Sequence, residues 1–119
     1  MIAQIRPAAF KQWLLTIASA GQVTPLVLDV REPWEVSKAC IQPLADASTF
    51  DVLQMPMQSI PHRLNELPQD RTIACLCHHG IRSQQVAAFL LHRGFEQVVN
   101  ISGGIDAWSL ELDASVASY

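Results

Sequence analysis

The segment Cys77-His78-His79-Gly80-Ile81-Arg82-Ser83 holds the side chains of this chain that point most clearly to chemistry. A wholly apolar run, 73–76, precedes it, and a helical pattern over 84–93, ended by Gly94, follows it. A cysteine therefore stands at the end of a predicted buried strand, in a short loop that faces the start of a helix. In α/β proteins this position favours a reactive thiolate.

The loop around this cysteine should stabilise a negative charge. Main-chain N–H groups of a tight loop and of a first helical turn lack internal partners and form a nest for an anion. The helix dipole adds partial positive charge at the same place. Gly80 gives the loop conformational freedom, and Arg82 and Ser83 can donate further hydrogen bonds. We therefore predict that Cys77 is a nucleophile. The loop would stabilise its thiolate or persulfide, or the oxyanions of a bound substrate.

The charges around the loop agree with an anionic substrate. The chain has a net charge of −3, yet no acidic residue lies between Asp70 and Glu96. The cationic and titratable residues of that window are Arg71, His78, His79, Arg82, His92 and Arg93. This pattern predicts attraction of an anion by the local field rather than by net charge. Chance spacing of six residues, some of them on an ordinary helix surface, is the alternative.

The composition limits the class of protein. Half of the 119 residues are hydrophobic and 16% are charged, so we expect one folded domain over residues 1–119. The acidic balance and the lack of a basic run argue against nucleic-acid binding. No apolar stretch approaches the roughly 20 residues that span a bilayer, so no membrane partner is expected. Three cysteines, an odd number, suit a reducing cytoplasm.

The periodicity predicts alternating helices and strands. Positions 10, 13, 14 and 17 are apolar and share one helical face, so 7–18 is interpreted as a core helix rather than a secretion signal. Strands are expected at 26–28, ending in Asp29, and at 52–55, 72–76 and 98–101. Helices are expected at 59–67, 84–93 and 105–110, with at most a short one within 31–38. This alternation predicts a parallel sheet covered by helices on both faces.

Several segments together resemble a known family. Cys-X-X-Gly-X-Arg-Ser after a buried strand resembles the active-site loop of rhodaneses, the sulfurtransferases. The segments 28–35, 94–98 and 103–108 are similar to other rhodanese segments and occur in the family's order, between about residues 5 and 109. Four residues separate Cys77 from Arg82, as in rhodaneses, whereas the related dual-specificity phosphatases and arsenate reductases have five. The spacing favours sulfur chemistry.

The resemblance implies a fold and a mechanism. The fold would be α/β, a rhodanese-like five-stranded parallel sheet with helices on both faces. Cys77 would take a sulfane sulfur from a small anionic donor, thiosulfate or a persulfide. It would then pass the sulfur to cyanide or to a thiol, including a protein thiol. No cofactor is implied.

The resemblance also implies roles for the neighbouring residues. The main chain of His78, His79, Gly80, Ile81 and Ser83 would hold the persulfide. Arg82 would shape the loop and hold the anion, and Asp29 and Arg31 would lie nearby in support. The stretch 38–41 departs from the Gly-His-Ile that the family often has there, and 42–50 is also unlike the family. The pocket wall on that side, and hence the acceptor, stays open.

Other interpretations remain beside this one. A small phosphatase or arsenate reductase, a regulatory binding module and a persulfide carrier are the alternatives. A zinc site built from Cys75, Cys77, His78 and His79 is not expected, because these near-consecutive residues cannot reach tetrahedral geometry without backbone strain.

Side chains outside the loop have structural explanations. We expect Trp34 and Trp108 in the core, and Cys40 as a small buried residue rather than a resolving thiol. His78 and His79 are expected to be exposed at the pocket mouth.

Overall fold

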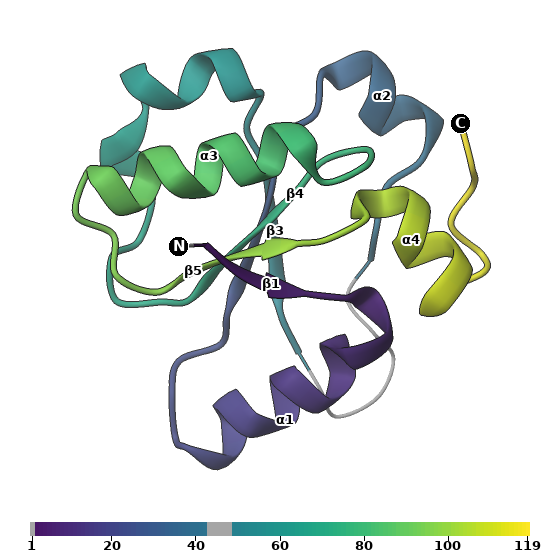
Figure 1. Cartoon of the computed structure of the whole chain (residues 1–119). Coiled ribbons are helices and arrows are strands. Elements are labelled where there is room, and N and C mark those ends of the chain that lie inside the picture. The colour runs from purple at the N-terminus through teal and green to yellow at the C-terminus, as the bar shows by residue number, and fades with distance from the viewer. Residues whose placement is uncertain (1, 43–48) are drawn as a thin grey trace.

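The computed structural model describes residues 2–42 and 49–119 (Figure 1). Five parallel strands form one sheet in the order β1-β5-β4-β2-β3. The strands are β1 (Ala3–Ile5), β2 (Leu26–Asp29), β3 (Asp51–Gln54), β4 (Ile73–Leu76) and β5 (Val98–Ile101). The α-helices are α1 (Phe10–Ser19), α2 (Pro33–Lys38), α3 (Ile81–His92) and α4 (Gly104–Glu111). Three short 3-10 helices are η1 (Pro7–Ala9), η2 (Met57–His62) and η3 (Leu64–Glu66). The predicted fold class is confirmed.

The apolar strands divide their side chains between two cores. Along β2, Leu26 and Leu28 pack into the core beneath α3 and η2, whereas Val27 packs into the core beneath α1 and α4. Along β4 the same alternation places Cys75 under α3 and Ala74 on the opposite face. Because successive strand residues point to opposite faces, a sheet covered on both sides needs apolar residues at every position. Figure 1 shows α3 and α1 on opposite sides of the sheet.

Two elements differ from the sequence prediction. The strand β1 was not predicted, since its three residues lie at the sheet edge and none is fully buried. The helix expected at 59–67 is instead the pair of 3-10 helices η2 and η3, with Pro61 inside η2. Because the observed helix begins at Met57, Pro61 is its fifth residue, where a proline has no N–H for the helical hydrogen bond and disfavours an α-helix.

The aromatic prediction was right for Trp108 and wrong for Trp34. Trp108 is fully buried and packs edge-on against Phe10 and Phe50. Trp34 is 61% exposed, because the six-residue helix α2 turns Glu35 rather than the indole toward the protein interior. Cys40 is half-buried. Residues 43–48, within the segment 42–50 that is unlike the family, lie outside the described residues.

The described residues contain no helix long and apolar enough to cross a membrane.

Candidate active site

Cys77 directly follows β4, at the carboxyl end of a central strand. The loop then turns at Gly80, whose φ of 99° is left-handed, and enters α3. The start of α4 holds the loop from the other side, since the main-chain N–H groups of Ile105 and Asp106 donate to Cys77 O and His78 O at 2.8 and 3.1 Å. This approach requires Gly104, because a Cβ there would lie 2.5 Å or less from the same two carbonyl oxygens.

The sulfur of Cys77 is buried and surrounded by hydrogen-bond donors. The main-chain N–H groups of Gly80 and Ser83 point at Sγ from 3.0 and 3.3 Å. The Ser83 hydroxyl lies 3.3 Å from the same atom. Only 1% of Cys77 is exposed. The two N–H groups are directed at Sγ from the loop and from the first turn of α3, which is the arrangement of an anion-binding nest.

Arg82 is engaged by an acidic residue from another helix. Its two terminal nitrogens donate to the two carboxylate oxygens of Glu35, each at 2.7 Å. The hydrogen bonds from Arg82 lower the pKa of Glu35 to about 2, although burial opposes the shift. The same pairing raises the pKa of Arg82. Sequence reasoning placed Arg82 at the loop but missed Glu35 as its partner.

The buried pair of Asp29 and Arg31 lies behind this ion pair. Arg31 donates to both carboxylate oxygens of Asp29, at 2.8 and 2.6 Å, and both side chains are at most 1% exposed. Burial opposes the charge of Arg31, but hydrogen bonds from its guanidinium, led by those to Asp29, raise its pKa above the usual range. Arg31 also reaches the main-chain oxygen of Glu35 at 3.4 Å. The two residues brace α2, and through it Glu35, without a hydrogen bond to Cys77.

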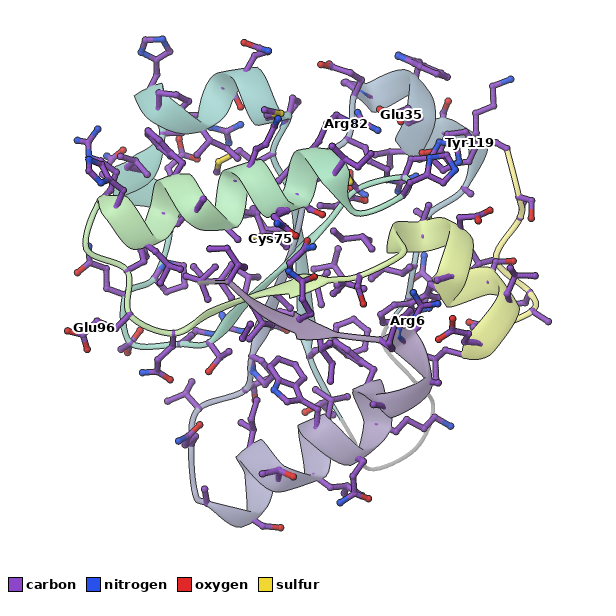
Figure 2. All side chains as sticks on the ribbon, in the orientation of Figure 1. Arg6, Glu35, Cys75, Arg82, Glu96 and Tyr119 are labelled. Carbon is purple, nitrogen blue, oxygen red and sulfur yellow. The ribbon has the colours of Figure 1, made fainter. Side chains whose placement is uncertain are left out.

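Tyr119 is a second residue of the site that sequence reasoning did not identify. Its hydroxyl accepts from Arg31 at 3.1 Å and donates to Glu35 at 3.0 Å. Its ring stacks on His78, with centroids 4.0 Å apart and planes 10° apart. Figure 2 shows Glu35, Arg82 and Tyr119 gathered at the same end of α3. The aromatic ring therefore forms one wall of the site, and its hydroxyl joins the Arg31 and Arg82 networks.

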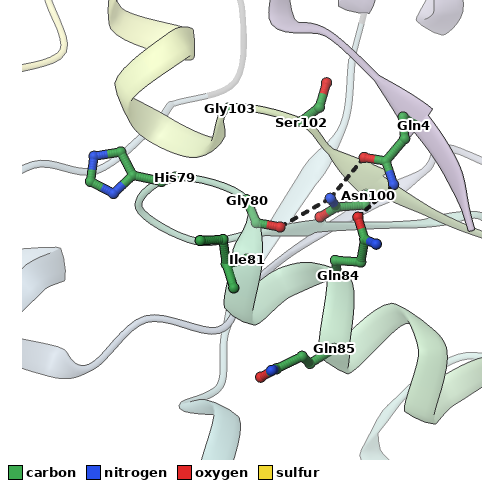
Figure 3. A pocket seen from close by; sticks show the side chains of 9 residues that line it. All are labelled: Gln4, His79, Gly80, Ile81, Gln84, Gln85, Asn100, Ser102 and Gly103. Carbon is green, nitrogen blue, oxygen red and sulfur yellow. Dashed lines mark hydrogen bonds between the residues drawn. The ribbon is translucent and has the colours of Figure 1, made fainter.

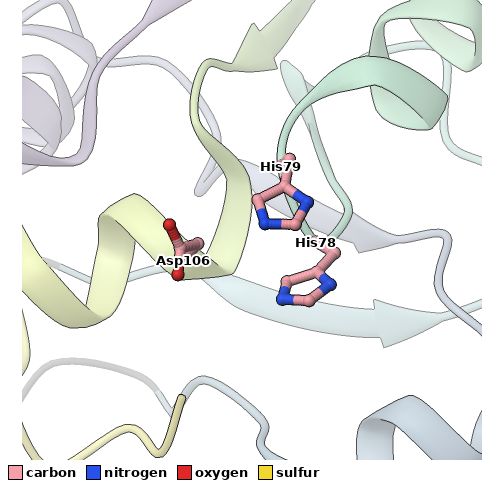
Figure 4. A group of neighbouring side chains, drawn as sticks. All are labelled: His78, His79 and Asp106. Carbon is pink, nitrogen blue, oxygen red and sulfur yellow. The ribbon is translucent and has the colours of Figure 1, made fainter. Parts of the chain in front are cut away.

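His78, His79 and Asp106 are the three described residues whose ligand-type atoms converge, all within 4.8 Å of one another (Figure 4). The two imidazole rings are stacked, with centroids 3.9 Å apart and planes 22° apart. Imidazole lone pairs lie in the ring plane, so two nearly parallel rings do not aim at one ion at a distance of about 2 Å. In this arrangement the two histidines form a rim. Burial lowers the pKa of His78, which favours its neutral form at neutral pH.

A small opening lies over Cys77. Its volume is about 280 Å³, and its lining residues are Cys77, His78, His79, Ile81 and Arg82. Ile81 and His79 are exposed at its edge, whereas His78 is half-buried. Cys75, which lies on β4, faces the core, where burial raises the pKa of its thiol to about 12. The opening thus borders the sulfur of Cys77 and not that of Cys75.

Known proteins resemble this chain over most of its length. The family model of the rhodanese-like domain matches residues 10–111. A sulfurtransferase from Allochromatium vinosum is 39% identical over 84 residues, which are 71% of each chain. Thiosulfate sulfurtransferase GlpE from Vibrio cholerae is 29% identical over 92 residues, covering 75% of this chain and 79% of GlpE.

The fold also matches a solved structure. The crystal structure of a rhodanese-like domain protein from Staphylococcus aureus has a TM-score of 0.73 and 24% identity, with 99% of both chains covered. This likeness shows the fold, and the matched family model together with the Allochromatium vinosum relative shows that the chain belongs to the rhodanese-like family of sulfurtransferases.

Proposed function

We propose that this chain works as a single rhodanese-like domain over residues 1–119, in the cytoplasm, and transfers a sulfane sulfur through a persulfide on Cys77. The donor is thiosulfate or a persulfide, and the acceptor is cyanide or a thiol, including a protein thiol. The observation that carries the proposal is the buried Sγ, which receives two main-chain N–H groups beneath a small opening.

The two half-reactions balance without a cofactor. The Cys77 thiolate attacks the outer sulfur of thiosulfate, a new S–S bond forms, and the old S–S bond breaks as its electron pair leaves with sulfite. In the second step, cyanide or a thiolate attacks the terminal sulfur of the persulfide. The Sγ–S bond breaks and its electron pair returns to Sγ as thiolate. The N–H groups of Gly80 and Ser83 stabilise that thiolate in both steps, first as nucleophile and then as leaving group.

The engagement of Arg82 favours sulfur over phosphate as the transferred group. A phosphoryl group needs a bidentate arginine for its oxygens. Here both terminal nitrogens of Arg82 are held by Glu35 at 2.7 Å. This supports a sulfurtransferase over the phosphatase and arsenate reductase alternatives.

The test is the intact mass after incubation with thiosulfate. We expect the protein to gain the mass of one sulfur atom and to lose it again on treatment with a thiol reductant or with cyanide. The cyanide treatment should release thiocyanate. Cys77→Ser should gain nothing, and the matched control Cys40→Ser should behave as wild type. Sulfur on Cys40 or Cys75 with Cys77 unmodified would contradict the proposal. Persulfide that only a protein partner can unload would instead identify a carrier.

A further inference from the structure

Two buried polar side chains lie behind Cys77 and have no part in the steps above. Ser83, on α3, is fully buried, and Asn100, on β5, is 1% exposed. The Ser83 Oγ lies 3.3 Å from Cys77 Sγ and 2.5 Å from Asn100 Oδ1. The Ser83 hydroxyl therefore sits between the nucleophile and an amide, and its one proton can serve only one of them at a time.

The orientation of the Asn100 amide is fixed by its other partners. Its Nδ2 lies 3.1 Å from the main-chain oxygen of Gly80 and 2.9 Å from Gln4 Oε1. A main-chain oxygen can only accept, so the amide NH₂ must face Gly80 and its oxygen must face Ser83. Gln4 in turn donates to Gln84 at 2.8 Å, and this row of amides borders a pocket of about 440 Å³ (Figure 3).

The direction of the hydrogen bond to Cys77 follows from that orientation. The Ser83 proton is donated to Asn100, and a lone pair of Ser83 Oγ faces Sγ. In this state the hydroxyl accepts from the S–H of a neutral Cys77, whereas the N–H groups of Gly80 and Ser83 donate to Sγ. The hydroxyl thus favours the thiol while the two N–H groups favour the thiolate.

We propose that Asn100 is a positioning residue that competes with Cys77 for the Ser83 proton and so sets how readily the nucleophile ionises. When Cys77 ionises or leaves as thiolate, the hydroxyl can rotate to donate to Sγ only by giving up its bond to Asn100. This competition would lower the reactivity of the resting sulfur, since a neutral thiol reacts with oxidants and alkylating agents more slowly than a thiolate does. The inference takes Cys77 as the nucleophile of the proposed function but does not need sulfur transfer for its test.

The other titratable groups near Cys77 lie outside this path. They are Cys75 on β4, Arg82 on α3 with Glu35 on α2, His78 and His79 in the loop, and Asp106 on α4. None of them is hydrogen-bonded to Ser83 or Asn100 through a side chain among the described residues. A change at Asn100 that leaves these groups in place should therefore act through Ser83 or through the main chain of Gly80, and a Ser83→Ala background separates the two routes.

The experiment measures the iodoacetamide alkylation rate against pH in a Cys40→Ser background. Asn100→Leu keeps the branched shape of asparagine but has no acceptor, so Ser83 should turn its proton to Sγ. We expect the midpoint of the rate profile to move about one pH unit lower. In a Ser83→Ala background the same Asn100→Leu change should move the midpoint little, since no hydroxyl remains to be released.

Two results would overturn the inference. One is a midpoint that stays or rises in Asn100→Leu. The other is an equal shift with and without the Ser83 hydroxyl, which would make Asn100 a mere brace of the loop. If Asn100→Leu fails to fold, as judged by circular dichroism, Asn100→Ala replaces it with the same expected direction and the same two refuting results. Because alkylation needs no sulfur donor, failure here and failure of the persulfide mass assay are separate outcomes.

Discussion

The two halves of the Glu35–Arg82 ion pair should differ in what their removal costs. The Glu35 side chain is 4% exposed, whereas that of Arg82 is 35% exposed. Arg82→Met would leave a buried carboxylate without its cation, and within residues 2–42 and 49–119 its remaining hydrogen-bond partners are the Glu32 N–H and the Tyr119 hydroxyl. Glu35→Gln would leave a guanidinium that water can reach. A buried charge that loses its partner costs more than an exposed one.

The size of the effect follows from the shift at Glu35. Its pKa falls from 4.5 to about 2, which corresponds to about 3 kcal/mol at most. Because Arg82 is about one-third exposed, solvent screening reduces this to about 1–2 kcal/mol for Glu35→Gln. We expect about 2–4 kcal/mol for Arg82→Met. For a domain of this size each kcal/mol lowers the thermal midpoint by about 4 °C.

Urea unfolding followed by far-UV circular dichroism at two pH values tests both numbers. A carboxyl whose pKa is lowered on folding stabilises the protein fully above its unfolded value, here 4.5, and loses that contribution as the pH falls toward 2. The difference in the free energy of unfolding between wild type and Glu35→Gln should therefore have its full value at pH 6 and be clearly smaller at pH 3. A gap that does not change with pH, or a larger cost for Glu35→Gln than for Arg82→Met, would refute the argument.

Three further outcomes are expected. Arg82→Lys should slow sulfur transfer at least about tenfold in steady-state assays, because one ammonium cannot replace the bidentate guanidinium that binds Glu35 beside the loop. Near-normal turnover of this variant would show that the bidentate contact is not needed for catalysis. Gly104→Ala should cost more than about 3 kcal/mol in urea unfolding, since its Cβ would meet loop carbonyl oxygens at 2.4–2.5 Å. Gly21 is also left-handed but has open space around it, so Gly21→Ala should cost only about 1–2 kcal/mol. An equal loss of stability in the two variants would show that the contact with the loop carbonyl oxygens is not what destabilises Gly104→Ala. Cys75, whose pKa is raised to about 12, should resist iodoacetamide at pH 8 in the folded protein while Cys40 reacts, as peptide mapping would show.

The central part of the fold was predictable because burial on both faces leaves a plain trace in the sequence. The strands β2 and β4 are continuous apolar runs and were predicted within one residue of their observed bounds. The helix α3 begins at Ile81, three residues before the predicted start, because the left-handed Gly80 already directs the chain into the first turn. The short edge strand β1 has neither length nor alternation to predict it.

The loop was predictable, but its partners were not. When a cysteine lies between a buried strand and a helix, local geometry alone predicts that main-chain N–H groups point at its sulfur. The partners are distant in the sequence: Glu35 lies 47 residues from Arg82, and Asn100 lies 17 residues from Ser83. Tyr119 binds Glu35 from 84 residues away. Those contacts depend on the strand order, which places β4 between β5 and β2. The spacing of Glu32 and Glu35 at the start of α2 was the one local signal for Glu35, as a capping pair.

The structure also changes the electrostatic argument for the loop. The acid-free window around Cys77 suggested a locally positive field, but acids from elsewhere in the sequence engage two of its three arginines. Arg82 binds Glu35, and Arg71 binds Asp51 on β3 at 2.7 Å. The lowered pKa of His78 removes another candidate charge at neutral pH. Fixed main-chain dipoles remain, which act over a few ångströms and need no counter-ion. We therefore propose that the shape of the loop, rather than the number of cations nearby, provides the site for an anion, so the conformation that Gly80 and Gly104 permit is what the chemistry depends on.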